Sequence, residues 1–335
     1  MATDTGKECW VGFDLGGTKM LATVFDADFR PLGRRRRKTR GHEGVDVGIK
    51  RIVRTIHEAL QEAKLDPARI TGIGIGCPGP IDPDRGIVLD TPNLGWRNVP
   101  LRDLVRQEFD CDVAVVNDVD AGIFGEYRFG AARGTRCAVG IFPGTGIGGG
   151  CIYEGRIFRG AAVTCVEIGH TYIAPPGGLS GVGRKGTLES VASRLAIAAA
   201  AAQAAFRGEA PRLMQEAGTD LANIRSSMLA SAIAAGDRAI ERIVREAAEQ
   251  LGIAIANVVH ILAPETIVLG GGLVEAMPRL FVDVAGQAAR RLVLSPYVDT
   301  FKVLPAELGD DAGVLGAAAW AREVVGGKLR VTSDE

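Results

Sequence analysis

The feature that most constrains the fold of this 335-residue chain is a strand pattern that occurs twice. The segment "VGFDLGGTKMLATVFDADFRPLGRRRRKT" (11–39) reads as an apolar strand, a glycine turn, a second strand, a tight turn and a third strand. The segment "CAVGIFPGTGIGGGCIYEGRIFRG" (137–160) repeats that order. Two copies of one supersecondary unit indicate a duplication and predict two α/β halves. If the halves face each other, their glycine turns point into one cleft.

Helices and buried strands alternate along the rest of the chain, as is typical of α/β domains. The predicted elements are helices over 47–63, 100–109, 188–207, 238–262 and 273–280, and strands over 70–79, 112–118 and 266–272. We predict a small N-terminal α/β domain over 1–117 and a large C-terminal α/β domain over 118–312. A last helix at about 313–330 is expected to pack back on the N-terminal domain.

The composition excludes several classes of function. The chain is 47% hydrophobic and 24% charged with a net charge of -1, so charge gives no reason to expect nucleic acid or membrane as a partner. The first ten residues lack the pattern of a signal peptide, and the apolar runs are shorter than the roughly 20 residues of a membrane span. Six cysteines without a C-x-x-C pair indicate free thiols in a reducing cytoplasm. We interpret the basic run Arg34 to Lys38 as an exposed edge strand.

Three glycine-rich turns, at 14–19, 144–150 and 270–272, each follow a short apolar strand. Glycines let backbone N–H groups approach an anion, although any one of these turns also serves as a simple tight turn. A Walker-type loop is absent, and the loose G-x-G-x-x-G at 144–149 precedes a strand rather than a helix, unlike a dinucleotide site. No basic residues visibly cluster around these turns.

Phosphoryl transfer needs a metal at the phosphates and a carboxylate that takes the acceptor's proton. Asp14, at a strand end beside a glycine turn, suits Mg²⁺ bound through water. Thr18 and Thr145 offer hydroxyls at the phosphate turns, or else are satisfied turn hydroxyls. Asp118, after an apolar strand ending at Asn117, is our candidate general base. The alternative interpretation makes Asp118 or Asp120 the N-cap of the next helix.

A second polar group follows the repeated unit. Glu167, His170 and Glu189 are side chains that could surround a polyhydroxylated ligand. The alternatives are a surface or core histidine and, for Glu189, a favourable charge in the first turn of a helix. Spacing alone does not decide between these interpretations.

Taken together, the motifs resemble the ROK family of bacterial sugar kinases and regulators, within the sugar kinase, actin and heat-shock ATPase superfamily. The motifs that carry the resemblance are "DLGGTK", "GCPGPID", "PNLGWRNVPL", "VNDVDAGIFGE", "GTGIGGG", "VEIGHT", "GRKGTLES" and "VLGGG", in family order from Asp14 to Gly272. The resemblance implies two RNase H-like (actin-like ATPase) α/β domains with ATP in an interdomain cleft. It also implies phosphorylation of a hexose 6-hydroxyl with ATP and Mg²⁺.

The resemblance assigns roles residue by residue. For phosphate and Mg²⁺ it implies Asp14, Gly16, Gly17, Thr18 and Lys19, with Gly144, Thr145 and Gly146 as a second phosphate loop and Gly271 and Gly272 against adenosine. For the sugar it implies Asn117, Asp118, Glu167, His170 and Glu189. Asp118 matches the family's catalytic base, in agreement with the role inferred from its place at a strand end.

One motif departs from the family. Ser180, Val182 and Thr187 stand where members commonly have the three cysteines of a structural zinc site. One imidazole with a serine and a threonine does not supply the usual zinc shell, so we predict no structural zinc. His170 is then free to act on the sugar, and hydrogen bonds and packing must hold the loop.

The expected function is a cytoplasmic, ATP-dependent hexokinase of glucokinase type, active as a homodimer or homotetramer. Open alternatives are another acceptor (fructose, N-acetylmannosamine, N-acetylglucosamine or allose) and polyphosphate as the donor. A sugar-sensing regulator is less expected, because only nine residues precede the first strand and Asp118 is present. A structural actin-like filament protein is disfavoured by the sugar-side residues Glu167, His170 and Glu189.

Overall fold

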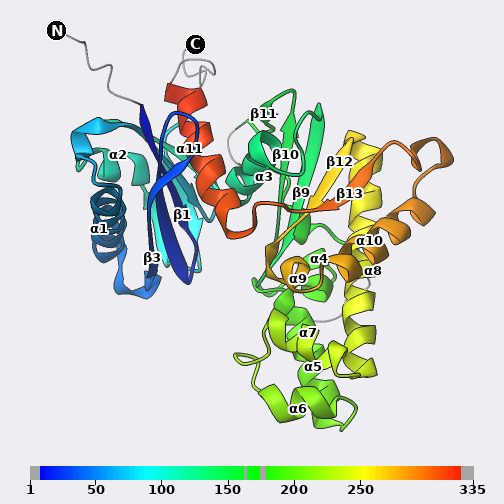
Figure 1. The fold of residues 1–335 in the computed structure, drawn as a ribbon. Helices are drawn as coiled ribbons and strands as arrows, with labels where there is room; N and C mark the ends of the chain where they lie inside the picture. Colours follow the sequence, from blue (N-terminus) through cyan, green and yellow to red (C-terminus); the bar gives the residue numbers. More distant parts are fainter. Residues whose placement is uncertain (1–7, 162–163, 174–178, 326–335) are drawn as a thin grey trace. The chain divides into compact units, whose positions relative to one another are not determined.

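The computed structural model describes residues 8–161, 164–173 and 179–325 (Figure 1). Two compact units emerge: unit 1 comprises Met1–Gly130, Ile157–Cys165 and Asp310–Glu335, and unit 2 comprises Ala131–Arg156 and Val166–Gly309. The domain boundary that we expected after Asn117 stays a prediction. Part of the predicted last helix, residues 326–330, lies outside the described residues.

The sheet of unit 1 is mixed and has five strands in the order β3-β2-β1-β4-β8. Their bounds are β1 (Cys9–Leu15), β2 (Lys19–Phe25), β3 (Pro31–Lys38), β4 (Ile70–Cys77) and β8 (Asp112–Asn117). The first three form an antiparallel meander, while β4 runs parallel to β1 and β8 parallel to β4. The carboxyl ends of β1, β4 and β8 therefore meet at one edge of the sheet.

The sheet of unit 2 has the same strand order. It consists of β9 (Cys137–Pro143), β10 (Ile147–Tyr153), β11 (Arg156–Ile157), β12 (Thr266–Leu269) and β13 (Lys302–Pro305), ordered β11-β10-β9-β12-β13. As in unit 1, the first two strands along the chain, β9 and β10, are antiparallel. The strand β12 runs parallel to β9, and β13 runs parallel to β12. The repeat that the sequence shows is thus a repeat of topology.

Helices cover both faces of the sheet in unit 1 (Figure 1). On one face lie α1 (Val45–Ala63) and α2 (Leu101–Arg106), and on the other α3 (Asp118–Phe129) and α11 (Ala312–Val325). Glycines bring α11 close: a Cβ on Gly74 of β4 would lie 1.8 Å from the Ala317 carbonyl oxygen, and one on Gly12 of β1 1.9 Å from that of Val314. This close packing fixes the start of α11 beside the end of β1.

Gly316→Ala is expected to destabilise unit 1 by about 3 kcal/mol, because overpacking a closed contact forces backbone shifts. The new Cβ would lie 1.7 Å from the Ala121 carbonyl oxygen, so α11 and α3 must separate. Gly286→Ala is the matched control, another helical glycine whose Cβ would first meet the flexible end of Arg290 at 3.2 Å. There the better helix propensity of alanine should leave stability unchanged or raise it by up to about 1 kcal/mol. Urea denaturation followed by circular dichroism measures both, and equal effects would contradict the packing argument.

Unit 2 also contains helices, which follow β11 along the chain. They are α4 (Leu188–Ala192), α5 (Arg194–Phe206), α6 (Pro211–Ala217), α7 (Ser226–Ala234), α8 (Arg238–Leu262), α9 (Gly271–Ala276) and α10 (Pro278–Leu292). The long α8 packs on α10, α4 and α5, and its apolar face shares one core cluster with β9, β10 and β12. This core carries the glycine turns at the ends of β9 and β12.

Two of the predicted helices are broken in the structure. The helix expected over 188–207 divides at Ser193, which ends α4 and caps α5 by accepting a hydrogen bond from Ala196 N at 3.2 Å. The helix expected over 273–280 divides at Met277, between α9 and α10. A serine inside an alanine-rich run is compatible with a continuous helix, so the sequence alone does not reveal the first break.

Short elements complete the structure. A small antiparallel sheet is formed by β5 (Ile81–Asp82), β6 (Ile87–Thr91) and β7 (Trp96–Val99), where we expected only a loop. The 3₁₀ turns are η1 (Gly41–Glu43), η2 (Pro67–Arg69), η3 (Ile168–His170), η4 (Ser295–Tyr297) and η5 (Gly309–Asp311). All six cysteines are free thiols. Within the described ranges, no helix combines the length and apolarity that a membrane crossing requires.

Candidate active site

The carboxyl ends of three parallel strands bring Asp14 and Asp118 of unit 1 near each other. Asp14 pairs with Gly76 across β1 and β4, and Cys77 pairs with Asn117 across β4 and β8. Burial raises the pKa of Asp14 from 3.8 to about 7, with further contributions from the carboxylates of Asp118 and Asp310. The two aspartates that we predicted for metal binding and proton transfer therefore lie near each other in one unit.

The N-cap of α3 is Asn117, and not Asp118 or Asp120 as the alternative interpretation proposed. Its Oδ1 accepts hydrogen bonds from the backbone N–H groups of Val119 at 2.9 Å and Asp120 at 3.2 Å. Asp118 stands in the first turn, where its Oδ1 also accepts from Val119 N at 3.0 Å. The capping interpretation of Asp118 or Asp120 is thus wrong, since the asparagine satisfies the end of the helix. This leaves Asp118 on a rigid element at the sheet edge.

The first glycine turn forms the wall of a pocket of about 230 Å³ in unit 1. The lining residues are Asp14, Gly16, Gly17, Thr18, Lys19, Met20, Leu21, Arg36 and Asp310. The turn is braced by Thr39, whose hydroxyl donates to the Gly16 carbonyl at 2.6 Å and whose N–H donates to the Thr18 carbonyl at 2.9 Å. Gly17, Thr18 and Lys19 are exposed, so the backbone and the cation of this turn are open to a ligand.

In unit 2 the other two glycine turns are neighbours, because they end the adjacent parallel strands β9 and β12. Gly271 has a φ of 80°, and a Cβ there would lie 2.9 Å from the Pro143 carbonyl oxygen. Glycine is needed at this position for both reasons. The structure thus brings the predicted second phosphate loop, Gly144 to Gly146, together with Gly271 and Gly272.

Arg194 holds the turn at Gly144 to Gly146, and sequence reasoning missed it. Its backbone N–H donates to the Gly144 carbonyl at 2.9 Å, and its Nη2 donates to Thr145 Oγ1 at 2.9 Å. The residue opens α5, directly after the cap at Ser193 that the alanine-rich pattern concealed. The hydroxyl of Thr145 therefore accepts a hydrogen bond from Arg194, while Thr145 remains exposed to solvent.

Glu189 connects two loops of unit 2 with its buried carboxylate. Its Oε2 accepts from Ile147 N at 3.1 Å, and its Oε1 accepts from Gly181 N at 3.0 Å. A Cβ on Gly146 would lie 2.3 Å from Oε2, so the glycine makes room for the carboxylate. Whether Glu189 also contacts a sugar stays a prediction; in the structure it holds the backbone directly after the Gly144 to Gly146 turn.

Glu189→Gln is expected to lower the free energy of unfolding by about 1–3 kcal/mol, because the amide NH₂ faces a backbone N–H and leaves one buried donor unpaired. Urea denaturation at pH 7 provides the measurement. Glu167→Gln, which changes an exposed carboxylate in the same way, is the control and should stay within about 0.5 kcal/mol of the wild type. A Glu189→Gln protein as stable as this control would contradict the conclusion that the Glu189 carboxylate connects the two loops.

Glu167 directly precedes η3 of unit 2, and His170 is the last residue of η3. A Cβ on Gly169 between them would lie 2.1 Å from the Ile147 carbonyl oxygen, so η3 is pressed against the start of β10. Glu167 is exposed and His170 is partly exposed. The backbone at both residues thus lies beside β10, the strand that follows the Gly144 to Gly146 turn.

At the positions of the missing cysteines the loop is held by hydrogen bonds. Ser180 Oγ accepts from Arg184 N at 3.1 Å, and Thr187 caps α4 by accepting from Ser190 N at 3.4 Å. In the described part of the chain, no three His, Cys, Asp or Glu side chains are grouped so that they could hold a metal ion. The lack of a structural zinc stays a prediction that rests on the residue types.

The predicted site residues therefore form two groups, one in each unit. Unit 1 holds Asp14, Gly16, Gly17, Thr18, Lys19, Asn117 and Asp118, and unit 2 holds Gly144, Thr145, Gly146, Glu167, His170, Glu189, Gly271 and Gly272. That both groups bind one nucleotide and one sugar stays a prediction.

Two mixed sheets of one topology, each with a glycine turn after its first strand, define an α/β protein of the actin-like ATPase class. Residues 10–324 match the model of the ROK family, and the chain belongs to that family. The solved structure of a ROK family glucokinase from Streptomyces griseus in complex with glucose and AMPPNP is similar, with a TM-score of 0.83 and 33% identity over 94% of this chain and 100% of that one. The fold class and the family that we predicted are confirmed.

Relatives of more than one function resemble the chain. The glucokinase of Thermotoga maritima is 34% identical over 95% of this chain and 98% of its own length. The xylose repressor of Caldicellulosiruptor bescii is 33% identical over 79% of this chain and 65% of its own length. The family therefore includes both kinases and repressors at similar identity.

Proposed function

We propose that the protein phosphorylates the 6-hydroxyl of a hexose with ATP as the donor, and that glucose is the preferred hexose. The observation that carries the proposal is the placement of Asp14 and Asp118 near each other at the sheet edge, with the first glycine turn directly after Asp14. A carboxylate for the cation and a carboxylate for the proton are the two acidic groups that phosphoryl transfer requires. The similarity to glucokinases over nearly the whole chain supports the same conclusion.

The residues present fit a nucleotide and its cation. The turns at Gly16 and Gly144 expose backbone without side chains, and Lys19 lines the pocket of the first turn. Mg²⁺ keeps most of its water and needs few protein ligands, so Asp14 with donor phosphates would suffice to hold it. When bound, Mg²⁺ neutralises charge on the phosphates. Ionised Asp14 is the form that this role requires.

In the proposed reaction, Asp118 accepts the proton of the sugar 6-hydroxyl. The hydroxyl oxygen forms a bond to the γ-phosphorus while the bond from phosphorus to the β,γ-bridging oxygen breaks, which yields hexose 6-phosphate and ADP. Asn117 fixes the first turn of α3 and hence the carboxylate of Asp118. Glu167, His170 and Glu189 are proposed to hold the other hydroxyls, and Gly271 and Gly272 to contact adenosine.

A second candidate function is a sugar sensor without transfer, which the similarity to xylose repressors favours. Other acceptor sugars and polyphosphate as the donor also remain part of the proposal. A cytoplasmic location is proposed from the six free thiols, and a homodimer or homotetramer from the resemblance to the family.

An assay of ADP release over a panel of hexoses and amino sugars tests the proposal. ATP and polyphosphate are compared as donors. Because polyphosphate releases no ADP, the reaction with polyphosphate is measured by the amount of sugar phosphate formed. NMR of the product identifies the phosphorylated hydroxyl. We expect glucose with ATP to give the largest kcat/KM. Sugar binding by calorimetry without turnover on any sugar would instead support the sensor and overturn the kinase.

A further inference from the structure

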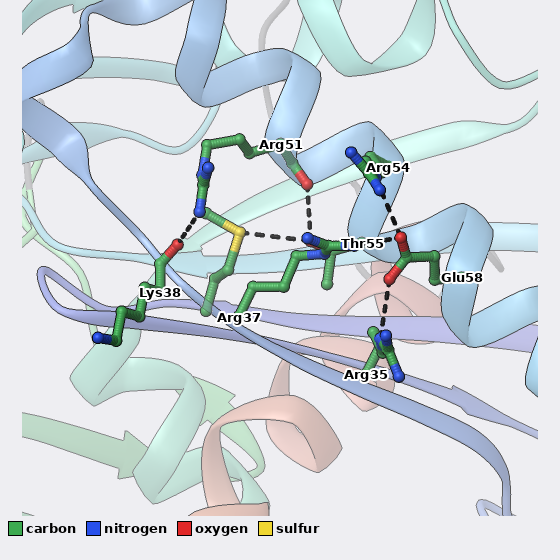
Figure 2. A network of polar contacts seen from close by, with 8 residues as sticks. Arg35, Arg37, Lys38, Arg51, Arg54, Thr55 and Glu58 are labelled. Atoms are coloured by element: carbon green, nitrogen blue, oxygen red, sulfur yellow. Dashed lines mark hydrogen bonds and ion pairs between the residues drawn. The ribbon is translucent and has the colours of Figure 1, made fainter.

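The basic run Arg34 to Lys38 is divided between the two faces of β3, because side chains alternate along a strand. Arg35 and Arg37 face α1, where both bind the carboxylate of Glu58 together with Arg54 (Figure 2). Glu58 Oε2 accepts from Arg35 Nε at 2.8 Å and Oε1 from Arg54 Nε at 3.0 Å. Arg35 and Arg37 attach the edge strand to the helix, which accounts for two of the five basic residues in the run.

The other face of β3 carries Arg34 and Arg36, which pair with two aspartates of η5, directly before α11. Arg34 Nη1 lies 2.8 Å from Asp311 Oδ1, and Arg36 Nη2 donates to Asp310 Oδ2 at 2.6 Å. The two arginine side chains are equally exposed, at 41% and 42%. Only Arg36 lines the pocket of the first glycine turn. The expectation that no basic residues gather at the phosphate turns is therefore wrong for this turn.

Lys19 extends the positive charge on the same face. It pairs with Lys38 across β2 and β3, and Lys38 shares a face with Arg36 two residues away. Both Lys19 and Arg36 line the pocket, and the charges of both lower the pKa of Asp14. A pocket that holds the carboxylates of Asp14 and Asp310 would repel an anionic ligand without these two cations.

We propose that Arg36, together with Lys19, binds the condensed phosphate chain of the donor, and that Asp310 is the partner which Arg36 releases when the donor binds. The assignment rests on the proposed function and names a further donor-binding residue for it. A planar guanidinium matches phosphate oxygens with two parallel hydrogen bonds. An ion pair between exposed side chains contributes little to stability, so exchanging Asp310 for phosphate is not prevented by the fold.

Calorimetric titration with AMPPNP and Mg²⁺, and separately with tripolyphosphate, tests this assignment. Arg36→Ala should raise the Kd of both ligands about 10- to 100-fold, as expected for lost charge-assisted hydrogen bonds, while the Kd of the hexose changes less than about twofold. Arg36→Lys should fall between the wild type and Arg36→Ala. Asp310→Asn should lower the Kd for both anions, because it frees Arg36 and removes a negative charge.

Arg34→Ala is the matched control, since it removes an equally exposed arginine and a similar ion pair from the same face of the strand. It should leave both affinities within about twofold of the wild type. Equal effects of Arg34→Ala and Arg36→Ala, or none from Arg36→Ala, would overturn the assignment and leave the proposed function intact. A wild-type protein that binds neither anion would overturn both. An effect on AMPPNP alone would overturn the assignment to the phosphate chain.

Discussion

Asp118→Asn is expected to lower kcat by about 10²- to 10⁴-fold, the usual range for removal of a general base. The amide has the same shape but does not take the proton of the attacking hydroxyl. Hexose binding should remain measurable by calorimetry, because Asn117 still caps α3 and holds residue 118 in place. The rate is measured by release of ADP with the best sugar of the panel.

Asp112→Asn is the control for this variant. It removes one carboxylate from the opposite end of the same strand, β8, where Asp112 is exposed and pairs with Arg106. Its kcat should match that of the wild type. If Asp118→Asn turned over at a rate near that of Asp112→Asn, Asp118 would have no part in proton transfer.

The duplicated strand pattern and its glycine turns could be predicted from the sequence, because apolar strands and glycines have strong local signals. The occurrence of two sheets with one topology, and the positions of Asp14 and Asp118 at strand ends, follow from that pattern. The similarity of the motifs to the ROK family supplied the roles of those residues.

What the sequence concealed depends on contacts between distant segments. Arg36 and Asp310 are far apart in the chain, and only the packing of α11 beside β1 brings both to the pocket of the first glycine turn. Arg194 reaches Thr145 in the same way, across a break between helices that an alanine-rich pattern hides. Glu189 does lie in the first turn of α4, as one interpretation of the sequence had it, but the sequence did not reveal that its two oxygens also join two loops. Such hydrogen bonds have no local periodicity by which to recognise them.

Asp14→Asn is expected to make the protein more stable and less active at once. The pKa of Asp14 is raised to about 7, so between about pH 4 and 7 the native state holds a proton that the unfolded state has lost. A state that binds more protons loses relative stability as the pH rises, so the wild type loses stability through this window. At about 1.4 kcal/mol for each pKa unit, the loss reaches about 4 kcal/mol above pH 7. Asparagine at this position carries no charge, so the Asp14→Asn protein does not lose this stability as the pH rises.

Urea denaturation at pH 4.5 and pH 8.5 measures how much stability the ionisation of Asp14 costs. The Asp14→Asn protein should be nearly as stable as the wild type at pH 4.5 and clearly more stable at pH 8.5, while its kcat falls by roughly 10²-fold or more because the carboxylate proposed for the cation is gone. Asp46→Asn, a surface change in the first turn of α1, controls for the loss of a charge and should show neither effect. An Asp14→Asn protein that is less stable than the wild type at pH 8.5 would show that the carboxylate stabilises the fold. The raised pKa of Asp14 would then not reflect a cost in stability of keeping a charged group ready for the donor.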